Sequence, residues 1–388
     1  MVMIKRQIEA EIRTRAQSYS VIVLVGPRQS GKTTLAKTLF PNYRYVLLED
    51  PDTRARLAAN PRGFFADLEK EVGVIIDEFQ RLPELLSYLQ GIVDAKPRPG
   101  FFILTGSQNF LMMEQVSQTL VGRATVLHLL PLSLAEATPT AWLPQIIFSG
   151  LYPRPYQHPQ EVLAWVSDYV TLYLERDART LINIKDLHLF QTFIRLCAGR
   201  VGNVLNITSL ANDCGISTHT AKQWLSILET CFVITLLQPY YKNFSKRLIK
   251  APKIYFVDTA LVCSLLGIEM PSQLPTHPLY GALFENMIIM EMIKARTNAG
   301  KRNNVYFWRD AQGHEVDALL DYNDHVRAVE VKSTQTITSS LLRGLMQWER
   351  LAHEHTALRS FVVHGGDEDS MWVDTALLSW RRSGDANK

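Results

Sequence analysis

The sequence predicts an α/β protein with more than one domain, and three observations lead to this prediction. The chain has 388 residues, more than one hydrophobic core usually serves, so two or three domains are expected. The short apolar run "VIVLV" (21–25) breaks at a glycine and is followed by a helical pattern. Similar runs at "VGVIIDE" and "GFFILTG" are typical of strands buried on both faces of a parallel sheet.

The composition is that of an ordinary globular protein, with 47% hydrophobic and 20% charged residues. A net charge of +3 neither demands nor excludes a nucleic-acid partner. Four separated cysteines without a Cys-x-x-Cys pair favour buried thiols over a metal site or disulfides. The charged segment "MVMIKRQIEAEIR" is unlike a signal peptide, and no apolar run is long enough to span a bilayer. We therefore expect a cytoplasmic protein that makes no membrane contact.

Residues 26–33, Gly-Pro-Arg-Gln-Ser-Gly-Lys-Thr, fit the pattern G-x-x-x-x-G-K-[ST] between a strand and a helix. Glycines let the backbone wrap so that N–H groups point at phosphate oxygens, and the helix N-terminus adds a positive dipole end. Lys32 would reach the β- and γ-phosphates, and the Thr33 hydroxyl would bind Mg²⁺. The alternative is a chance match on a glycine turn. The predicted nucleotide-binding residues are Gly26, Pro27, Arg28, Gln29, Ser30, Gly31, Lys32, Thr33 and Thr34.

An acidic pair, Asp77 and Glu78, follows the second apolar run. Ligands of open α/β sheets bind at the carboxyl ends of the strands. Asp77 is therefore predicted to hold Mg²⁺ together with Thr33, and Glu78 to polarise the attacking water. A solvated strand end would show the same two residues.

Two further residues are candidates for the same chemistry. Ser107 lies in the polar segment Thr105–Gln108 that ends the third run, where it could sense the γ-phosphate; simple turn chemistry is the alternative. Arg123 follows a glycine and could neutralise transition-state charge in a neighbouring subunit as an arginine finger. A surface arginine at a helix end would look alike.

After the predicted nucleotide-binding domain (1–130), Pro- and Gly-rich stretches mark a junction, and residues 131–185 are expected to form a helical lid or linker. In residues 186–275, two short helical patterns surround Gly215, as in a helix-turn-helix, and Ser217 could cap the second helix. The runs "CFVITLLQPYY" and "KIYFVD" would supply the hairpin of a winged-helix-like domain. A helical packing module that never touches DNA is the alternative.

The winged-helix reading adds two groups of candidate DNA contacts. Polar residues would face outward on the recognition helix, and a basic run nearby could bind phosphates, although solvated loop lysines would look the same. The recognition-helix residues are Thr218, His219, Lys222 and Gln223, and the basic run comprises Lys242, Lys246, Arg247, Lys250 and Lys253.

The last predicted domain (276–388) contains a helix with Glu285 and then the strand patterns "VYFWRD", "HEVDALL" and "VRAVEVKS". In Glu330-Val331-Lys332, period two puts Glu330 and Lys332 on one face, and antiparallel pairing would bring Asp317 beside them. Asp317 and Glu330 would hold Mg²⁺, with Lys332 activating water. This pattern resembles the restriction-endonuclease-like fold. Glu285 matches the acidic residue that this fold carries on a helix. An Asp–Lys–Glu ion-pair cluster is the structural alternative.

Four motifs, "GPRQSGKTTL", "VIIDEFQR", "LTGSQNF" and "LVGRA…LPLSLAEA", occur in this order. They resemble the bacterial and archaeal AAA-type P-loop ATPases (AAA_14) that carry a C-terminal region of unknown function (DUF4143). The segments "YLERDAR", "KIYFVDTAL" and "EVD…EVK" extend the resemblance over nearly the whole chain. The resemblance implies hydrolysis of ATP with Mg²⁺ and strengthens Arg123 as a finger acting in trans in a homo-oligomer.

The main hypothesis is a Mg²⁺-dependent AAA-type ATPase that acts on or near DNA through winged-helix-like and nuclease-like domains. One alternative is an ATP-driven conformational switch that binds protein partners and cuts nothing. Another is an ATP-fuelled, metal-dependent nuclease.

Overall fold

The computed structural model describes residues 4–107, 116, 118–174, 186–240, 250–310, 312–336, 338, 342–352, 357–372 and 375–387. The chain forms two compact units. Unit 1 comprises residues 1–131, 230–232 and 297–301, and unit 2 comprises 132–229, 233–296 and 302–388. No helix in these described stretches is long and apolar enough to cross a membrane.

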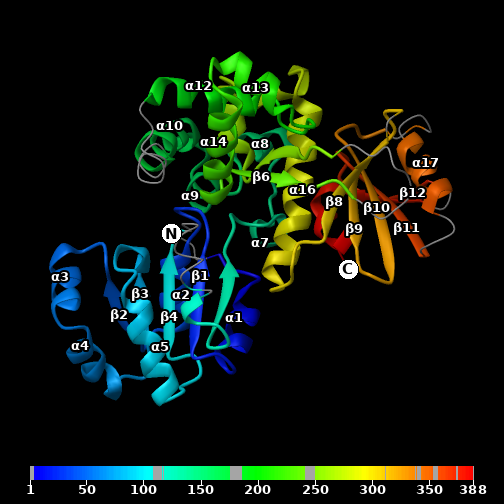
Figure 1. Ribbon diagram of the computed structural model, residues 1–388. Coiled ribbons are helices and arrows are strands. Elements are labelled where there is room, and N and C mark those ends of the chain that lie inside the picture. The colour runs from blue at the N-terminus through cyan, green and yellow to red at the C-terminus, as the bar shows by residue number, and fades with distance from the viewer. Residues whose placement is uncertain are drawn as a thin grey trace. The chain divides into compact units, whose positions relative to one another are not determined.

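Unit 1 is built on a five-stranded sheet in the order β2-β3-β4-β1-β5, in which every neighbouring pair is parallel (Figure 1). The predicted strands at 21–25, 74–77 and 102–106 are confirmed, whereas β2 and β5 lie in segments for which no strand was predicted. The elements are α1 (Glu9–Ala16), β1 (Val21–Val25), α2 (Lys32–Leu39), β2 (Arg44–Leu47), α3 (Pro51–Ala59), α4 (Pro61–Asp67), η1 (Leu68–Lys70), β3 (Val74–Asp77), η2 (Phe79–Arg81), α5 (Leu85–Ala95), β4 (Phe102–Gly106) and β5 (Ala124–His128).

The sheet of unit 1 is buried on both faces, which explains its continuous apolar strands. Alternate residues of β1 belong to different cores: Val21 and Val23 pack with residues of α3, α4 and α5, and Ile22 with residues of α1 and α2. Because all five strands are parallel, their carboxyl ends meet at one edge. The loop after β1, the end of β3 and the end of β4 therefore lie together.

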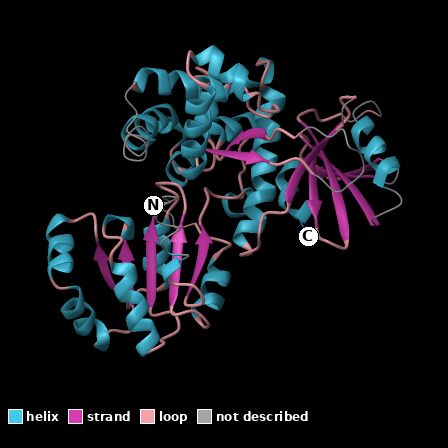
Figure 2. Cartoon of the chain, viewed as in Figure 1, coloured by secondary structure: helices cyan, strands magenta, loops and turns pink. Residues whose placement is uncertain are grey.

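Unit 2 begins with helices, which precede β6 in the described part of this unit (Figure 2). The predicted pair of helices around Gly215 is confirmed: α13 ends directly before this glycine, whose φ is 70°, and α14 follows. The prediction that Ser217 caps α14 is also confirmed, because its Oγ accepts from the Thr220 N–H at 3.0 Å. The two expected strands pair antiparallel as β6 and β7.

The helical part of unit 2 also bears out a helical segment after residue 131. Of the segment Tyr173–Arg179 quoted above, residues 175–179 lie outside the described part. The elements are α7 (Leu134–Ala137), α8 (Leu143–Ser149), α9 (Pro153–Gln157), η3 (Pro159–Glu161), α10 (Val162–Asp168), η4 (Tyr169–Leu174), α12 (Leu187–Ala198), α13 (Ile207–Cys214), α14 (Thr218–Thr230), β6 (Ile234–Leu237), β7 (Lys253–Phe256), α15 (Thr259–Leu265) and η5 (Pro271–Thr276).

The rest of unit 2 is a six-stranded sheet in the order β12-β13-β11-β10-β9-β8. Strands β8, β9 and β10 form an antiparallel meander, and β11 pairs parallel to β10. The helix expected around Glu285 is α16. The elements are α16 (Tyr280–Asn298), β8 (Val305–Arg309), β9 (Glu315–Asp321), β10 (His325–Lys332), α17 (Arg343–Ala352), β11 (Ala357–His364), β12 (Ser370–Trp372), β13 (Thr375–Ser379) and η7 (Trp380–Asn387).

Candidate functional sites

The loop between β1 and α2 has a backbone that only particular residues can adopt. Gly26 has a φ of 154°, and a Cβ atom there would lie 2.2 Å from the Leu129 carbonyl oxygen. Gly31, at the start of α2, has a φ of 97°, in the region that favours glycine. Both glycines of the motif are therefore required by the shape of the loop.

Lys32 is the first residue of α2, and its side chain folds back over the loop. Its ammonium donates to the carbonyl oxygens of Gly26 at 3.0 Å and Pro27 at 2.7 Å. In the same loop Ser30 is fully buried, and its Oγ has no hydrogen-bond partner among the described residues. A wrapped loop with a buried ammonium and an unsatisfied hydroxyl fits a phosphate ligand. Of the other predicted binding residues, Pro27 is buried, Arg28 is half-buried, and Gln29 in the loop and Thr34 in α2 are exposed.

Asp77 ends β3 and is held by several uncharged donors. The Thr33 hydroxyl donates to its Oδ2 at 2.8 Å, and the Tyr45 hydroxyl donates to the same oxygen at 2.7 Å. The Thr105 hydroxyl and the Glu78 N–H donate to Oδ1. Thr33 and Asp77, predicted from separate motifs, thus touch each other. An adjacent hydroxyl and carboxylate offer the hard oxygen ligands that Mg²⁺ prefers.

Glu78 stands next to Asp77 in a left-handed conformation, with a φ of 55°. Such strained residues cluster at functional sites. Its carboxylate accepts from the Gln80 amide, which also bonds the Ser107 hydroxyl at 3.1 Å. The structure therefore joins Glu78 to Ser107 through Gln80, a residue that sequence reasoning missed although it lies in the quoted segment "DEFQR". Gln108 lies outside the described residues.

Arg123 is not brought to the loop of its own chain. It directly precedes β5, and its carbonyl oxygen accepts from the N–H of Val21, the first residue of β1. The loop follows the last residue of β1, so Arg123 lies at the opposite edge of the sheet. Its guanidinium pairs with both carboxylate oxygens of Asp94.

Arg6 also holds the loop in place, and the sequence analysis did not identify it. Its guanidinium is buried and donates to the carbonyl oxygens of Ser30 at 2.9 Å and Leu130 at 2.7 Å. It ties the loop to the segment after β5. No motif in the sequence marks Arg6, because its partner Ser30 lies 24 residues further along the chain.

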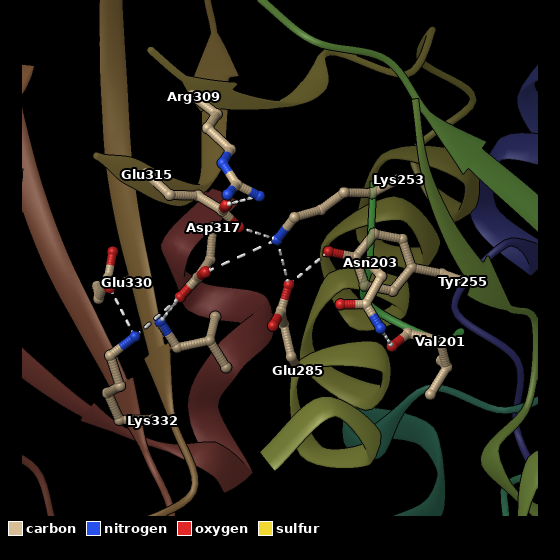
Figure 3. A network of polar contacts seen from close by, with 11 residues as sticks. Val201, Asn203, Lys253, Tyr255, Glu285, Arg309, Glu315, Asp317, Glu330 and Lys332 are labelled. Carbon is tan, nitrogen blue, oxygen red and sulfur yellow. Dashed lines mark hydrogen bonds and ion pairs between the residues drawn. The ribbon is translucent and has the colours of Figure 1, made fainter. Parts of the chain in front are cut away.

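Unit 2 contains a second cluster of charged side chains, drawn in Figure 3. The antiparallel pairing of β9 and β10 is confirmed, and Asp317 lies beside Lys332, with 3.3 Å between Oδ2 and Nζ. Lys332 also pairs with Glu330 at 2.5 Å. Asp317 further accepts from the Val331 N–H at 2.8 Å. Burial and the neighbouring Asp317 carboxylate raise the pKa of Glu330 to about 8.

Glu285 reaches this cluster through a residue that was assigned another role. Lys253, the first residue of β7, places its ammonium 2.8 Å from Glu285 and 3.9 Å from Asp317, and it also pairs with Glu315. Only 2% of the Lys253 side chain is exposed. The prediction that Lys253 belongs to a phosphate-binding basic run is therefore wrong, because its side chain is buried and neighbouring carboxylates neutralise it. Lys250 is exposed, and Lys242, Lys246 and Arg247 lie outside the described residues.

The residues of this second cluster do not fit a divalent metal. Two ammoniums already lie among the carboxylates, one on each oxygen of Asp317. Within the described residues, no group of three or more His, Cys, Asp or Glu side chains is arranged to hold a metal ion. The structure thus brings Glu285, Asp317, Glu330 and Lys332 together as predicted, but around lysine ammoniums.

The fold and the first site define a class. A parallel sheet whose interior strand β1 leads through a glycine loop to a lysine on α2, with Asp77 ending the nearby strand β3, is the arrangement of a P-loop ATPase domain. The AAA-domain family (AAA_14) matches residues 18–138. Two domains of unknown function match the remainder, DUF8612 at residues 140–272 and DUF4143 at residues 280–381.

Whole-chain relatives place the protein more narrowly. The uncharacterized protein Rv2008c of Mycobacterium tuberculosis is 30% identical over 361 residues, which cover 91% of this chain and 80% of the relative. The uncharacterized protein Mb2031c of Mycobacterium bovis gives the same values. The chain belongs to this family of P-loop ATPases with an AAA domain and a C-terminal domain of unknown function.

Solved structures share less with the chain. The Walker-type ATPase PABY2304 of Pyrococcus abyssi aligns with a TM-score of 0.47 and 12% identity, covering 68% of this chain and 96% of that one. The Holliday junction branch migration motor RuvB of Thermotoga maritima aligns with a TM-score of 0.31 and 16% identity, covering 59% of this chain and 88% of that one.

Proposed function

We propose that unit 1 binds ATP with Mg²⁺ and hydrolyses it. The observation that carries this proposal is the Thr33–Asp77 hydrogen bond beside the buried Lys32. Lys32 would compensate the charge of the phosphates, and Thr33 and Asp77 would hold the metal ion, which neutralises developing phosphate charge when bound. Mg²⁺ accepts such oxygen ligands readily.

The water that attacks the γ-phosphate would be oriented by Glu78. The Gln80 amide, shared between Glu78 and Ser107, fixes both side chains at the edge where the phosphate would lie. Arg123 would act on the nucleotide of a neighbouring subunit, since its place before β5 keeps it from its own loop. This role requires a homo-oligomer.

ATP turnover by the Lys32→Ala variant tests the proposal. We expect turnover to be abolished, because the phosphates lose their main cationic partner. Lys96→Ala is the matched control, since Lys96 is an exposed lysine after α5 in the same unit. Full turnover by Lys32→Ala would refute the site.

We further propose that unit 2 acts on DNA. Helices α12, α13 and α14 followed by the β6–β7 pair have the layout of a winged helix. His219, Lys222 and Gln223 are exposed along α14, and Thr218 is half-buried. Exposed polar side chains on the second helix of a helix-turn-helix contact bases and phosphates in the major groove. The order α16, β8-β9-β10 meander, α17 and parallel β11 supports the restriction-endonuclease-like fold for the rest of the unit.

Fluorescence anisotropy with a labelled duplex tests the DNA proposal. We expect Lys222→Ala to weaken binding and to lower the salt slope by about 1, because one phosphate contact is lost. Lys301→Ala, at an exposed lysine of unit 1, should leave binding unchanged. ATPase rates that do not respond to DNA, with no binding to the duplex, would favour the ATP-driven switch that binds protein partners.

A further inference from the structure

Lys253 lies where three separate elements of unit 2 converge. It comes from β7, Glu285 comes from α16, and Glu315 and Asp317 come from β9. Figure 3 shows the Lys253 side chain extending toward these carboxylates. Lysines at a surface normally direct their ammonium to water, whereas this one is 2% exposed and ends among acids.

The charges of the cluster are nearly balanced without any added ion. The four carboxylates of Glu285, Glu315, Asp317 and Glu330 face the ammoniums of Lys253 and Lys332 and the guanidinium of Arg309, which lies 3.3 Å from Glu315. Burial alone would lower the pKa of Lys253, but the neighbouring Tyr255 and the carboxylates of Glu285, Asp317 and Glu315 hold it well above its ordinary value. Lys253 is therefore charged at any physiological pH.

Three carboxylate oxygens, both of Asp317 and one of Glu285, are correspondingly occupied, whereas Glu330 Oε2 has no hydrogen-bond partner among the described residues. Asp317 Oδ1 faces Lys253, and Oδ2 accepts from Lys332 and the Val331 N–H. Glu285 Oε1 accepts from both Lys253 and the Tyr255 hydroxyl, at 2.8 and 2.5 Å. A divalent cation needs several of these oxygens at once. It would also stand beside a buried ammonium, at a large electrostatic cost.

We propose that Lys253 is the resident cation of this nuclease-like cluster and takes the place of the divalent metal. The Lys253 ammonium holds β7 to α16 and β9, and the cluster binds a divalent ion only when that ammonium is removed. Replacing Lys253 by a neutral residue removes one positive charge and releases Glu285 Oε1 and Asp317 Oδ1 from the ammonium, which leaves two oxygen ligands of the kind a divalent ion prefers. The inference goes beyond ATP hydrolysis and DNA binding and depends on neither.

The test measures Mn²⁺ binding to the full chain by electron paramagnetic resonance, without nucleotide. Every sample carries Asp77→Asn, which silences the metal ligand of unit 1. We expect no bound Mn²⁺ for this parent, and about one ion per chain after Lys253→Met. Adding Asp317→Asn to Lys253→Met should abolish that binding. Lys253→Arg, which keeps the charge, should behave as the parent.

A second measurement keeps the proposal testable if Lys253→Met folds poorly. Mn²⁺ should raise the melting temperature of the Lys253→Met chain, because a ligand that binds only the folded state stabilises it. The parent should show no such shift. Bound Mn²⁺ in the parent that Asp317→Asn removes would overturn the proposal, and this comparison uses only chains that retain Lys253. A folded Lys253→Met chain without bound Mn²⁺ would overturn it as well.

Discussion

The buried pair Glu291–Lys294 on α16 gives the sharpest stability prediction. Each side chain is 3% exposed, and the Lys294 ammonium lies 2.9 Å from Glu291 Oε1. Lys294 also donates to the Leu132 carbonyl oxygen at 2.8 Å, and Glu291 Oε2 accepts from the Leu134 N–H at 2.7 Å. The pair therefore fixes the start of α7 to α16. Lys294→Met would leave the Glu291 carboxylate buried without its cation.

The free-energy cost of Lys294→Met follows from the loss of this ion pair. Removing one partner of a buried ion pair typically costs about 3–5 kcal/mol, because the remaining charge is not compensated. Burial already raises the pKa of Glu291 even with Lys294 present, and losing Lys294 would raise that pKa further. A carboxyl group with a raised pKa in the folded state destabilises the protein as pH rises. The cost of Lys294→Met should therefore be largest at pH 8 and smaller at pH 5, where Glu291 can hold a proton.

Urea unfolding followed by tryptophan fluorescence measures this cost in unit 2 alone, because all seven tryptophans lie there. The double variant Glu291→Gln/Lys294→Met should recover most of the loss, since it removes both charges and keeps an acceptor for Leu134. Asp385→Asn is the matched control at the same spacing: its partner Arg382 is 58% exposed, and such surface pairs contribute about 0–1 kcal/mol. A cost for Lys294→Met no larger than that of Asp385→Asn at pH 8 would refute the reasoning.

Three further predictions concern single residues. Gly26→Ala should lower the stability of unit 1, measured by calorimetry, by about 2 kcal/mol or more through overpacking. Gly91→Ala is the control: a Cβ added at Gly91 would meet no atom within 4 Å, so this change should stabilise α5 by about 0.5–1 kcal/mol. Gln80→Ala should slow ATP turnover about tenfold or more and leave ATP binding unchanged, because it releases Glu78; weaker ATP binding with normal turnover would contradict this. Burial raises the pKa of Asp258 to about 6, so between about pH 4 and 6 the stability of unit 2 should fall as pH rises, by roughly 3 kcal/mol from this group. Asp258→Asn should remove that part of the slope in urea titrations, and an unchanged slope would exclude the assignment.

Local patterns were sufficient where one short segment determines the geometry. The strand, loop and helix of residues 21–39 could be predicted because the apolar run, the two glycines and the lysine are adjacent in sequence. The convergence of Asp317, Glu330 and Lys332 could be predicted because side chains two residues apart lie on the same face of a strand. It required one assumption, that the two strands carrying these residues pair antiparallel. Tyr45 was missed and Lys253 was assigned another role, because each has a partner that is distant in sequence and no motif marks either pair. Tyr45 contacts Asp77 across 32 positions and Lys253 contacts Glu285 across 32 positions.

The failure to identify these residues from the sequence has one physical cause. Nothing near Lys253 in the sequence distinguishes a buried counter-ion from a solvated loop lysine, because burial is decided by elements that come later in the chain. Strands β2 and β5 were missed for a related reason. Both carry several half-buried positions, so neither shows the continuous apolar run that marks β1, β3 and β4.

The two carboxylate sites differ in what surrounds the acid, and this difference underlies the chemistry that we propose for each. The hydroxyls of Thr33, Tyr45 and Thr105 that donate to Asp77 are uncharged, so they orient the carboxylate without neutralising it. Asp317 instead faces two ammoniums, which orient it and neutralise it together. A carboxylate that keeps its charge attracts a divalent cation. A carboxylate already paired with an ammonium gains little from binding the cation, because the ammonium must leave before the cation can bind. Acid-containing motifs on strands predicted a metal at both places, and only the partner residues separate the site proposed to take Mg²⁺ from the one that holds lysine.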